Sequence, residues 1–494
     1  MSLPASPASA PPDPRRWWVL AVIGAAQLMV VLDATIVNIA LPSAQVDLGF
    51  SDSDRQWVVT AYSLAFGSLL LIGGRLADLF GRKRAFLAGA AGFALASALA
   101  GAAGSFELLI LGRVLQGIFG AVLAPACLTL LNTTFTAGRE RAKALGVFGA
   151  IAGTGGAIGL LLGGVLTEHL SWRWTLYVNL VFAVLAIVGG ILLLHPARDP
   201  GRPRLDVPGT LFVSTGLFCV VYGLSEAESD GWTSATTLGL LAAGTVLVAA
   251  FAYWQTRAAS PLLPLRILQD RNRAASFTAV LVAAVGMFGI FLFLTYYLQV
   301  SLGYSPVSTG LAFLPMIFAL VLSAQIATNI SVRRTGLRVA VPGGMLLAAG
   351  GLVWLTGIGL DTGYASHVLP PLIVIGLGLG HVMPPAIGAA TAGVLPADAG
   401  AASATVNTMQ QVGGSIGTAL LNTLAASAAT RYLTDHPGDP AARAEAGIHS
   451  FTTAFWWSAG IFAAGALATA VLYRSATPAE EPAESSGKTA ALHL

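Results

Sequence analysis

The chain is a succession of long apolar runs separated by short polar segments. Fourteen runs are long enough for a membrane span, which takes about 20 mostly apolar residues. Because helices satisfy their own backbone polar groups in lipid, the pattern predicts an all-α membrane bundle of fourteen transmembrane helices. The expected spans lie near residues 17–41, 57–77, 85–104, 107–131, 144–167, 174–194, 209–226, 234–254, 275–299, 308–329, 339–359, 367–391, 401–424 and 451–473.

Composition supports this pattern and excludes an ordinary soluble enzyme. Of the 494 residues, 55% are hydrophobic and 10% are charged, whereas a soluble domain carries about 25% charged residues. Fourteen spans leave no room for a sizeable soluble domain. The two cysteines, Cys127 and Cys219, fall inside apolar runs and are expected to be packing residues. We expect no cofactor, no metal and no nucleic-acid partner, and a monomer in the bilayer.

The basic residues predict the orientation of the spans. When the N-terminus is placed inside, most of the 26 Lys and Arg residues fall in loops on the same side. Arg55 and Arg173 fall on the outer side. Because cytoplasmic loops are enriched in Lys and Arg, both termini are predicted to be cytoplasmic. Abundant Ala, Gly and Arg indicate a GC-rich bacterial genome and hence a bacterial inner membrane.

A repeated loop pattern predicts two related halves. GRLADLFGRKR at 74–84 and ISVRRTGLR at 330–338 each combine a helix end, a glycine and flanking bases on the same side. Equivalent loops in two six-helix halves indicate a duplicated transporter architecture with a central cavity. The expected segments are a disordered leader at 1–16, an N-terminal half at 17–197, a linker with inserted helices 7 and 8 at 198–260, a C-terminal half at 261–474 and a disordered tail at 475–494.

Two charged residues lie deep inside apolar runs, where ionisable groups are costly and often mark ion or substrate paths. Asp33 in the first span and Arg113 in the fourth lie at similar predicted depths, about 12 and 10 Å from the outer side. Removal from water disfavours an ionised carboxyl group, whereas a nearby guanidinium favours it. An Arg contact that forms and breaks would therefore switch Asp33 between releasing and binding a proton. The alternative is a static ion pair that locks the two spans together.

Other polar residues within the spans are candidates for the lining of a substrate cavity. Hydrogen bonding between helices explains each amide and hydroxyl about as well, and a lone histidine is more often satisfied by a neighbouring helix. Tyr296 belongs to an aromatic stretch suited to flat lipophilic solutes, although interface anchoring is the commoner role. The candidates are Gln27, Asn38, Tyr62, Gln116, Tyr296, Gln299, His381, Asn407 and Gln410.

Several motifs together resemble the major facilitator superfamily, specifically its fourteen-span drug:proton antiporter branch of quaternary-ammonium and multidrug exporters. They are LDATIVNIALP at 32–42, the loop at 74–84, RVLQG at 113–117 and NTMQQVGGSIGTA at 407–419. The resemblance implies the major facilitator fold, with two inserted helices, and proton-coupled export of lipophilic small molecules by alternating access. It also implies that Asp33 carries the proton and that Arg113 takes part in its transfer.

The resemblance implies two further motifs. One is a gating loop formed by Gly74, Asp78, Gly81, Arg82 and Lys83. The other is the glycine motif of the fifth span, in which small residues allow close helix packing. Its matching glycines are Gly155, Gly159, Gly163 and Gly164, and Leu160 stands where the family has proline.

The patterns leave alternatives to a proton-coupled exporter, among them a passive channel or a non-transporting sensor. Because the fifth-span motif lacks its proline, a proton-coupled importer or symporter of a small solute is the alternative to an exporter. A multispan membrane enzyme is a remote alternative, since the outer loops carry only scattered acidic, histidine and serine residues. Some exporters of the branch that the motifs resemble use an acidic residue in the tenth span for divalent organic cations; the span near 308–329 has none here, so the resemblance implies neutral, weakly cationic or anionic substrates rather than dications.

Overall fold

A computed structural model of the chain describes residues 15–52, 54–135, 138–195, 206–394, 398–437 and 439–474. Most of the expected leader and all of the tail from 475 lie outside these residues. Within them the predicted all-α class is confirmed. The helices are α1 (Arg16–Leu48), α2 (Arg55–Phe80), α3 (Arg82–Gly101), α4 (Phe106–Thr134), α5 (Gly138–His169), α6 (Trp174–Leu193), α7 (Val207–Ser229), α8 (Ala235–Gln255), α9 (Arg266–Gln269), α10 (Arg271–Tyr296), α11 (Pro306–Ile326), α12 (Val332–Thr335), α13 (Leu337–Leu355), α14 (Leu369–Thr391), α15 (Ala399–Asp435) and α16 (Ala442–Leu472).

Fourteen of these helices are long, and α9 and α12 are single turns. In the part of the chain that the structure describes, eleven helices are long and apolar enough to cross a membrane by length and composition. Short π-helical turns continue α10 and α11 and precede α14; they span Tyr297–Ser301, Ala327–Ser331 and Tyr364–Val368. Their wider turns displace the backbone within otherwise regular helices.

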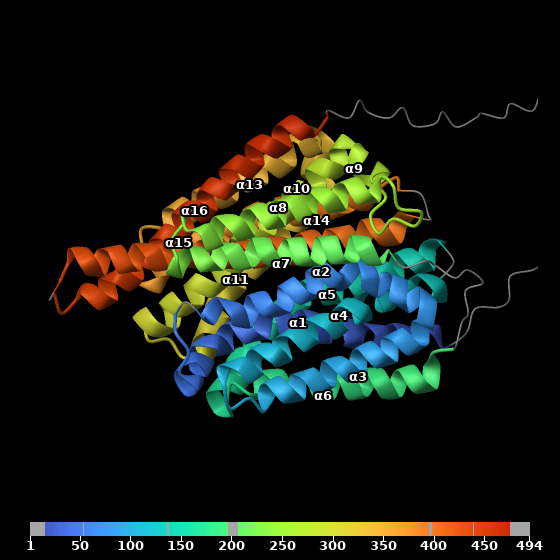
Figure 1. The fold of residues 1–494 in the computed structure, drawn as a ribbon, viewed down its shortest axis with the longest axis horizontal. Coiled ribbons are helices and arrows are strands. Elements are labelled where there is room, and N and C mark those ends of the chain that lie inside the picture. The colour runs from blue at the N-terminus through green and yellow to red at the C-terminus, as the bar shows by residue number, and fades with distance from the viewer. Residues whose placement is uncertain are drawn as a thin grey trace, which may run out of the picture.

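The helix packing repeats between two halves. In one half α1 packs against α4, α5 and α6, and α2 and α3 pack against α4. In the other half α10 packs against α14, α15 and α16, and α11 and α13 pack against α14. Figure 1 shows the first half in blue and teal and the second in yellow to red. The same six-helix arrangement is therefore built twice.

Two helix pairs form the seam between the halves, where α2 packs against α15 and α5 packs against α11. The remaining pair, α7 and α8, packs together, and α7 also contacts both α2 and α15. It therefore covers one side of the seam, as its green ribbons in front of the bundle show (Figure 1).

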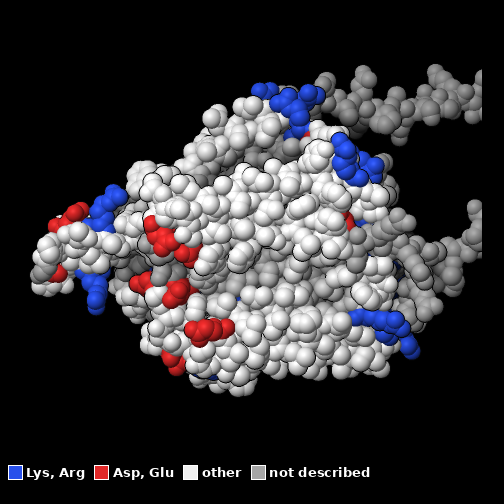
Figure 2. Space-filling model, in the orientation of Figure 1, with Lys and Arg blue, Asp and Glu red and all other residues white. Residues whose placement is uncertain are grey.

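The two ends of the bundle differ in charge. We call the end where α1 begins and α16 ends the terminal end, and the opposite end the far end; they lie on the right and left of Figure 1. On the face shown in Figure 2, Lys and Arg gather at the terminal end and Asp and Glu at the far end. The helices α15 and α16 extend beyond the bundle at the far end as a hairpin that carries both signs of charge.

Candidate functional site

The two charged residues that the sequence placed inside the membrane are in contact. Asp33 of α1 is fully buried and Arg113 of α4 is 1% exposed. A terminal nitrogen of Arg113 donates to Oδ2 of Asp33 at 2.5 Å. Charge-assisted hydrogen bonds of this kind are short and strong. The ion pair therefore joins α1 to α4 at this level. Removing one partner would leave the other charge buried and unpaired, which is costly.

The second carboxylate oxygen of Asp33 is held by two amide side chains. Gln116 and Asn179 each donate to Oδ1 at 2.8 Å. The hydroxyl of Ser97 accepts from the same two amides, at 2.8 Å from Gln116 and 3.3 Å from Asn179. All four side chains are fully buried. Four helices, α1, α3, α4 and α6, therefore meet at one carboxylate.

Arg113 has further partners besides Asp33. Its Nε donates to the carbonyl oxygen of Val58 at 2.9 Å, and a terminal nitrogen donates to Oε1 of Gln116 at 2.9 Å. Its guanidinium carbon lies 4.5 Å from the centre of the Tyr62 ring. Such a ring attracts a cation that is removed from water. The guanidinium therefore keeps favourable contacts that do not depend on Asp33.

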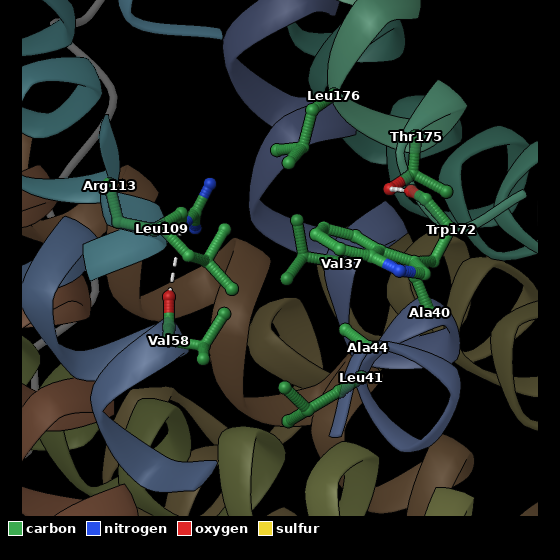
Figure 3. A pocket seen from close by; sticks show the side chains of 10 residues that line it. All are labelled: Val37, Ala40, Leu41, Ala44, Val58, Leu109, Arg113, Trp172, Thr175 and Leu176. Atoms are coloured by element: carbon green, nitrogen blue, oxygen red, sulfur yellow. Dashed lines mark hydrogen bonds between the residues drawn. The ribbon is translucent and has the colours of Figure 1, made fainter. Parts of the chain in front are cut away.

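A small cavity lies on the far-end side of Arg113, lined by α1, α2, α4, the start of α6 and the residue Trp172 before it. Its volume is about 10 Å³. Figure 3 shows Arg113 at one side of this space and the indole of Trp172 at another. Its walls are mainly apolar; the lining residues are Val37, Ala40, Leu41, Ala44, Val58, Leu109, Arg113, Trp172, Thr175 and Leu176.

At the far end the two halves are joined through a buried cation. Arg55, the first residue of α2, is 6% exposed and donates to Oδ1 of Asn422 in α15 at 3.1 Å. Its guanidinium carbon lies 4.4 Å from the centre of the Tyr296 ring in α10. The hydroxyl of Tyr296 in turn donates to Gln45 of α1 at 2.5 Å. This arrangement closes the far end between α1, α2, α10 and α15.

Two more hydrogen bonds cross between the halves at the far end. The side-chain amide of Gln299 donates to the carbonyl oxygen of Ile39 in α1 at 3.0 Å. The backbone N–H of Val307, at the start of α11, donates to Glu168 at the end of α5 at 2.9 Å. The closed far end therefore involves both helix pairs of the seam, α2 with α15 and α5 with α11.

The loop motif at 74–84 connects α2 to α3 at the terminal end. Gly81 has φ +91°, a left-handed backbone that favours glycine and lets the chain reverse between the helices. Lys83 donates to the carbonyl oxygens of Ile191 and Leu194 at 2.9 and 2.6 Å, and so caps the end of α6. Arg82 begins α3 and is partly exposed. The side chain of Asp78 lies outside the described residues.

Adjacent glycines of α2 differ in their surroundings. A Cβ atom on Gly74, the residue that the motif identifies, would meet only Pro125 at 3.6 Å, an ordinary contact. A Cβ atom on Gly73 would lie 1.9 Å from the backbone oxygen of Ala121 in α4. The close approach of α2 to α4 therefore depends on Gly73.

The fifth-span glycines lie where α5 crosses other helices. Cβ atoms on Gly155, Gly159 and Gly163 would come within 2.9 Å of α1. Gly164 faces α11 instead, where a Cβ atom would lie 2.6 Å from the oxygen of Pro306. Leu160 is fully buried. These residues allow α5 to pack against both halves.

The other candidates for a substrate cavity are dispersed. The ring nitrogens of His381 lie 2.6 Å from Ser323 Oγ and 3.1 Å from Ser331 Oγ, which ties α14 to α11 and its π-helical turn. Asn38 donates to its own helix and is 3% exposed. Asn407 is exposed and also bonds within its helix. Two further candidates are partly exposed, Gln27 and Gln410.

Three residues have a place in this arrangement that was not identified from the sequence. Two of them, Ser97 and Asn179, lie around Asp33. The third, Arg55, lies at the closed far end. Asn179 is an amide within an apolar run, the kind of signal that identified Gln116. Arg55 follows a polar loop, so that its burial depends on α10 and α15, which are distant in the sequence.

Comparison with known families supports the same fold. The family model described as Major Facilitator Superfamily matches residues 23–418. The chain belongs to this superfamily. It is therefore a multi-pass membrane transporter and not an enzyme. A bacterial homologue of the human lysosomal transporter Spinster, in an inward-facing and occupied conformation, has the same fold, with a TM-score of 0.63 over 94% of this chain and 97% of that one at 15% identity.

Similar proteins within the superfamily are named for antibiotic resistance or export. The puromycin resistance protein pur8 of Streptomyces alboniger is 50% identical over 97% of this chain and 96% of its own length. The cephamycin export protein CmcT of Amycolatopsis lactamdurans is 39% identical over 84% of this chain and 86% of its own length. These names agree with the drug-exporter branch that the sequence motifs resemble.

Proposed function

We propose that the protein is a proton-coupled exporter of lipophilic small molecules, antibiotics or toxic metabolites among them, in a bacterial inner membrane. The observation that carries the proton coupling is the fully buried carboxylate of Asp33, held by Arg113, Gln116 and Asn179. An ionisable group at such depth is costly, which favours a function in transport. The names of the relatives, such as puromycin resistance and cephamycin export, support antibiotic-like substrates.

The geometry permits a proton to replace Arg113 at the carboxylate. A proton on Asp33 removes the negative charge that holds the guanidinium. Arg113 then retains the carbonyl oxygen of Val58, the amide oxygen of Gln116 and the face of Tyr62. Protonation thus loosens the contact between α1 and α4 without leaving the guanidinium isolated. Return of the proton to water restores the ion pair.

The helix α1 connects this exchange to the closed far end. It carries Asp33 and also Ile39 and Gln45, which bond to α10 and its π-helical turn. Asp33 and Gln45 are twelve residues apart, about 18 Å along the helix. A shift of α1 upon proton exchange would therefore act on the contacts between the halves. Arg55 would have to leave Tyr296 and Asn422 for the far end to open.

The charge distribution favours an orientation with the terminal end in the cytoplasm. Lys and Arg gather at that end (Figure 2), and cytoplasmic loops are enriched in these residues. Both termini would then be cytoplasmic and the far end would face outward. We infer that the loop at 74–84, with Gly74, Asp78, Gly81, Arg82 and Lys83, gates the cytoplasmic side. The protein would act as a monomer in the lipid bilayer.

Transport in oriented vesicles tests the proposal. Inside-out vesicles containing the protein are given puromycin as the probe, and a proton gradient is imposed with the acidic side inside. The expected result is uptake of puromycin that stops when the gradient is collapsed. Asp33→Asn should abolish this uptake, while a variant such as Arg431→Gln on the exposed hairpin should retain it.

Two results would overturn the proposal. One is gradient-driven uptake at the wild-type rate by Asp33→Asn protein. The other is gradient-driven movement of the probe in the opposite direction, which would identify an importer. Because Asp33→Asn leaves Arg113 buried without its counter-charge, its amount in the membrane is measured alongside.

A further inference from the structure

The cavity beside Arg113 is formed by the N-terminal half. Its described lining residues all come from α1, α2, α4, the start of α6 and Trp172 just before it. Along α1 the lining residues Val37, Ala40 and Ala44 continue from Asp33 toward the far end. The cavity therefore extends from Arg113, the partner of Asp33, toward the far end of α1.

Trp172 forms the part of the cavity wall that lies next to the far end. The side chain lies just before α6 and is 5% exposed. Its indole N–H donates to Oδ2 of Asp47 at 2.9 Å. Arg173 stacks on the indole, with its guanidinium carbon 4.5 Å from the ring centre, and donates to Oδ2 of Asp47 at 2.5 Å. The side chains of Arg173 and Asp47 are 30% and 46% exposed, so that both partners of Trp172 reach solvent.

Because the cavity is small and mainly apolar, the position of Trp172 determines whether water enters it. A volume of about 10 Å³ is at the lower limit for one water molecule. Apolar walls hold water weakly, and the polar groups at hand are Arg113 and Thr175. Thr175 already donates to the carbonyl oxygen of Trp172 at 2.6 Å. A displaced indole would join this space to the far surface and let water reach Arg113.

We propose that this cavity is the far-side entrance for protons to Asp33 and that Trp172 is its lid. The proposal rests on the proton-carrying role of Asp33 in the proposed function. In this proposal the proton and the substrate take different routes through the protein. The proton would pass through the N-terminal half, whereas the substrate would pass between the halves, where α2 meets α15 and α5 meets α11. Asp47 and Arg173 act as positioning residues that hold the lid closed.

Thiol accessibility tests the lid without requiring transport. The reporter is Ala44→Cys, in protein whose Cys127 and Cys219 are replaced by serine, and the reagent is methanethiosulfonate ethylammonium added at the far side of oriented liposomes. Ala44 lines the cavity and is 3% exposed. With Trp172→Ala we expect the reaction to be about tenfold faster, because opening costs less free energy. Asp47→Ala releases the indole of Trp172 but keeps its side chain in place, and it should also increase the reaction rate of Ala44→Cys.

A second reporter controls for a general loosening of the bundle. Ser415→Cys lies on α15 at the seam, where the serine hydroxyl bonds to Ser63 of α2 at 2.9 Å. Its reaction rate should not change with Trp172→Ala or Asp47→Ala. Equal reaction rates of Ala44→Cys with and without both lid variants would overturn the lid. A parallel increase at both reporters would overturn it as well.

Proton leak without substrate links the opened cavity to Asp33. Liposomes with Trp172→Ala protein should lose an imposed proton gradient faster than wild type, and Asp33→Asn added to Trp172→Ala should remove that excess. A leak that persists without Asp33 would overturn the cavity as the entrance to this carboxylate. Failure of the proposed function is a separate result, because it would show as normal efflux by Asp33→Asn alone while the accessibility result stands.

Discussion

Asn179 of α6 donates to the same carboxylate oxygen of Asp33 that accepts from Gln116, each at 2.8 Å. The two amides hold the carboxylate with its other oxygen toward Arg113. The site thus joins α6 to α1 and α4, so that a structural change at Asp33 reaches three helices. Asn179 also lies in the second turn of α6, the helix that begins at Trp174 just after the lid residue Trp172.

Replacing Asn179 should therefore weaken both the fold and transport. Asn179→Leu removes one donor to a buried charge, and we expect a loss of about 1–3 kcal/mol in the free energy of unfolding. Asn407→Leu is the matched control for stability, because Asn407 is exposed and donates to Ser403 of its own helix; it should change stability by less than about 0.5 kcal/mol. Thermal unfolding in detergent measures both variants. Equal melting temperatures would argue against a buried role for Asn179.

The adjacent glycines of α2 should respond differently to alanine. In Gly73→Ala the new methyl group meets the backbone of α4, and we expect a cost of about 1–3 kcal/mol from overpacking. In Gly74→Ala it makes an ordinary contact, and the reduced chain entropy should stabilise the helix by about 0.5–1 kcal/mol. Unfolding of both variants in the same detergent checks this order. The reverse order would mean that α2 and α4 are not packed as described.

Loss of Arg55 should open the far end. Arg55→Ala removes the stacking on Tyr296 and the bond to Asn422, both of which join the two halves. Spin labels at the exposed positions Leu170 and Val300, on opposite halves, report their separation. We expect a longer mean distance in Arg55→Ala than in wild type, and no change in Arg431→Ala. An unchanged distance in Arg55→Ala would show that other contacts suffice to close this end.

An ion pair between the exposed Arg266 and the buried Asp398 should make stability depend on pH. Arg266 donates to both oxygens of Asp398, at 2.6 and 2.7 Å, and so holds the pKa of this carboxyl below its usual value. A carboxyl with a lowered folded-state pKa stabilises the fold above its unfolded pKa, and the stabilisation is lost as the pH falls through the folded value. Asp398→Asn should therefore be less stable than wild type near pH 7, and this difference should shrink as the pH falls below the ordinary pKa of an aspartate, about 3.9. A difference that is constant with pH would point to packing instead.

The sequence predicts the fold well because the bilayer imposes a strong constraint. Apolar runs of about 20 residues correspond to the long helices. The charge pair could also be predicted, because Asp33 and Arg113 are rare ionisable residues at similar depths in apolar runs. The partners of this pair depend on the rotation of each helix about its axis, which hydropathy does not encode. Asn179 and Ser97 therefore emerge only from the structure, and so does Arg55, whose burial requires contacts with α10 and α15.

Gly73 and Gly74 also show that the sequence does not reveal which face of a helix contacts its neighbour. The loop motif identifies Gly74, yet the close backbone contact lies at Gly73. Tyr62 and Gln116, predicted for a substrate cavity, contact Arg113 and Asp33 in this conformation. Their exposure to substrate in another conformation stays a prediction.

The protonation state of Asp33 can be observed directly. Infrared difference spectra of the reconstituted protein, recorded between low and high pH with and without puromycin, detect the carbonyl stretch of a protonated carboxyl group. If Asp33 carries the proton, we expect a band that is present in one condition, lost in the other and absent from Asp33→Asn protein. If Asp33 contributes no such band in any condition, the carboxylate stays ionised throughout, and it cannot carry the proton.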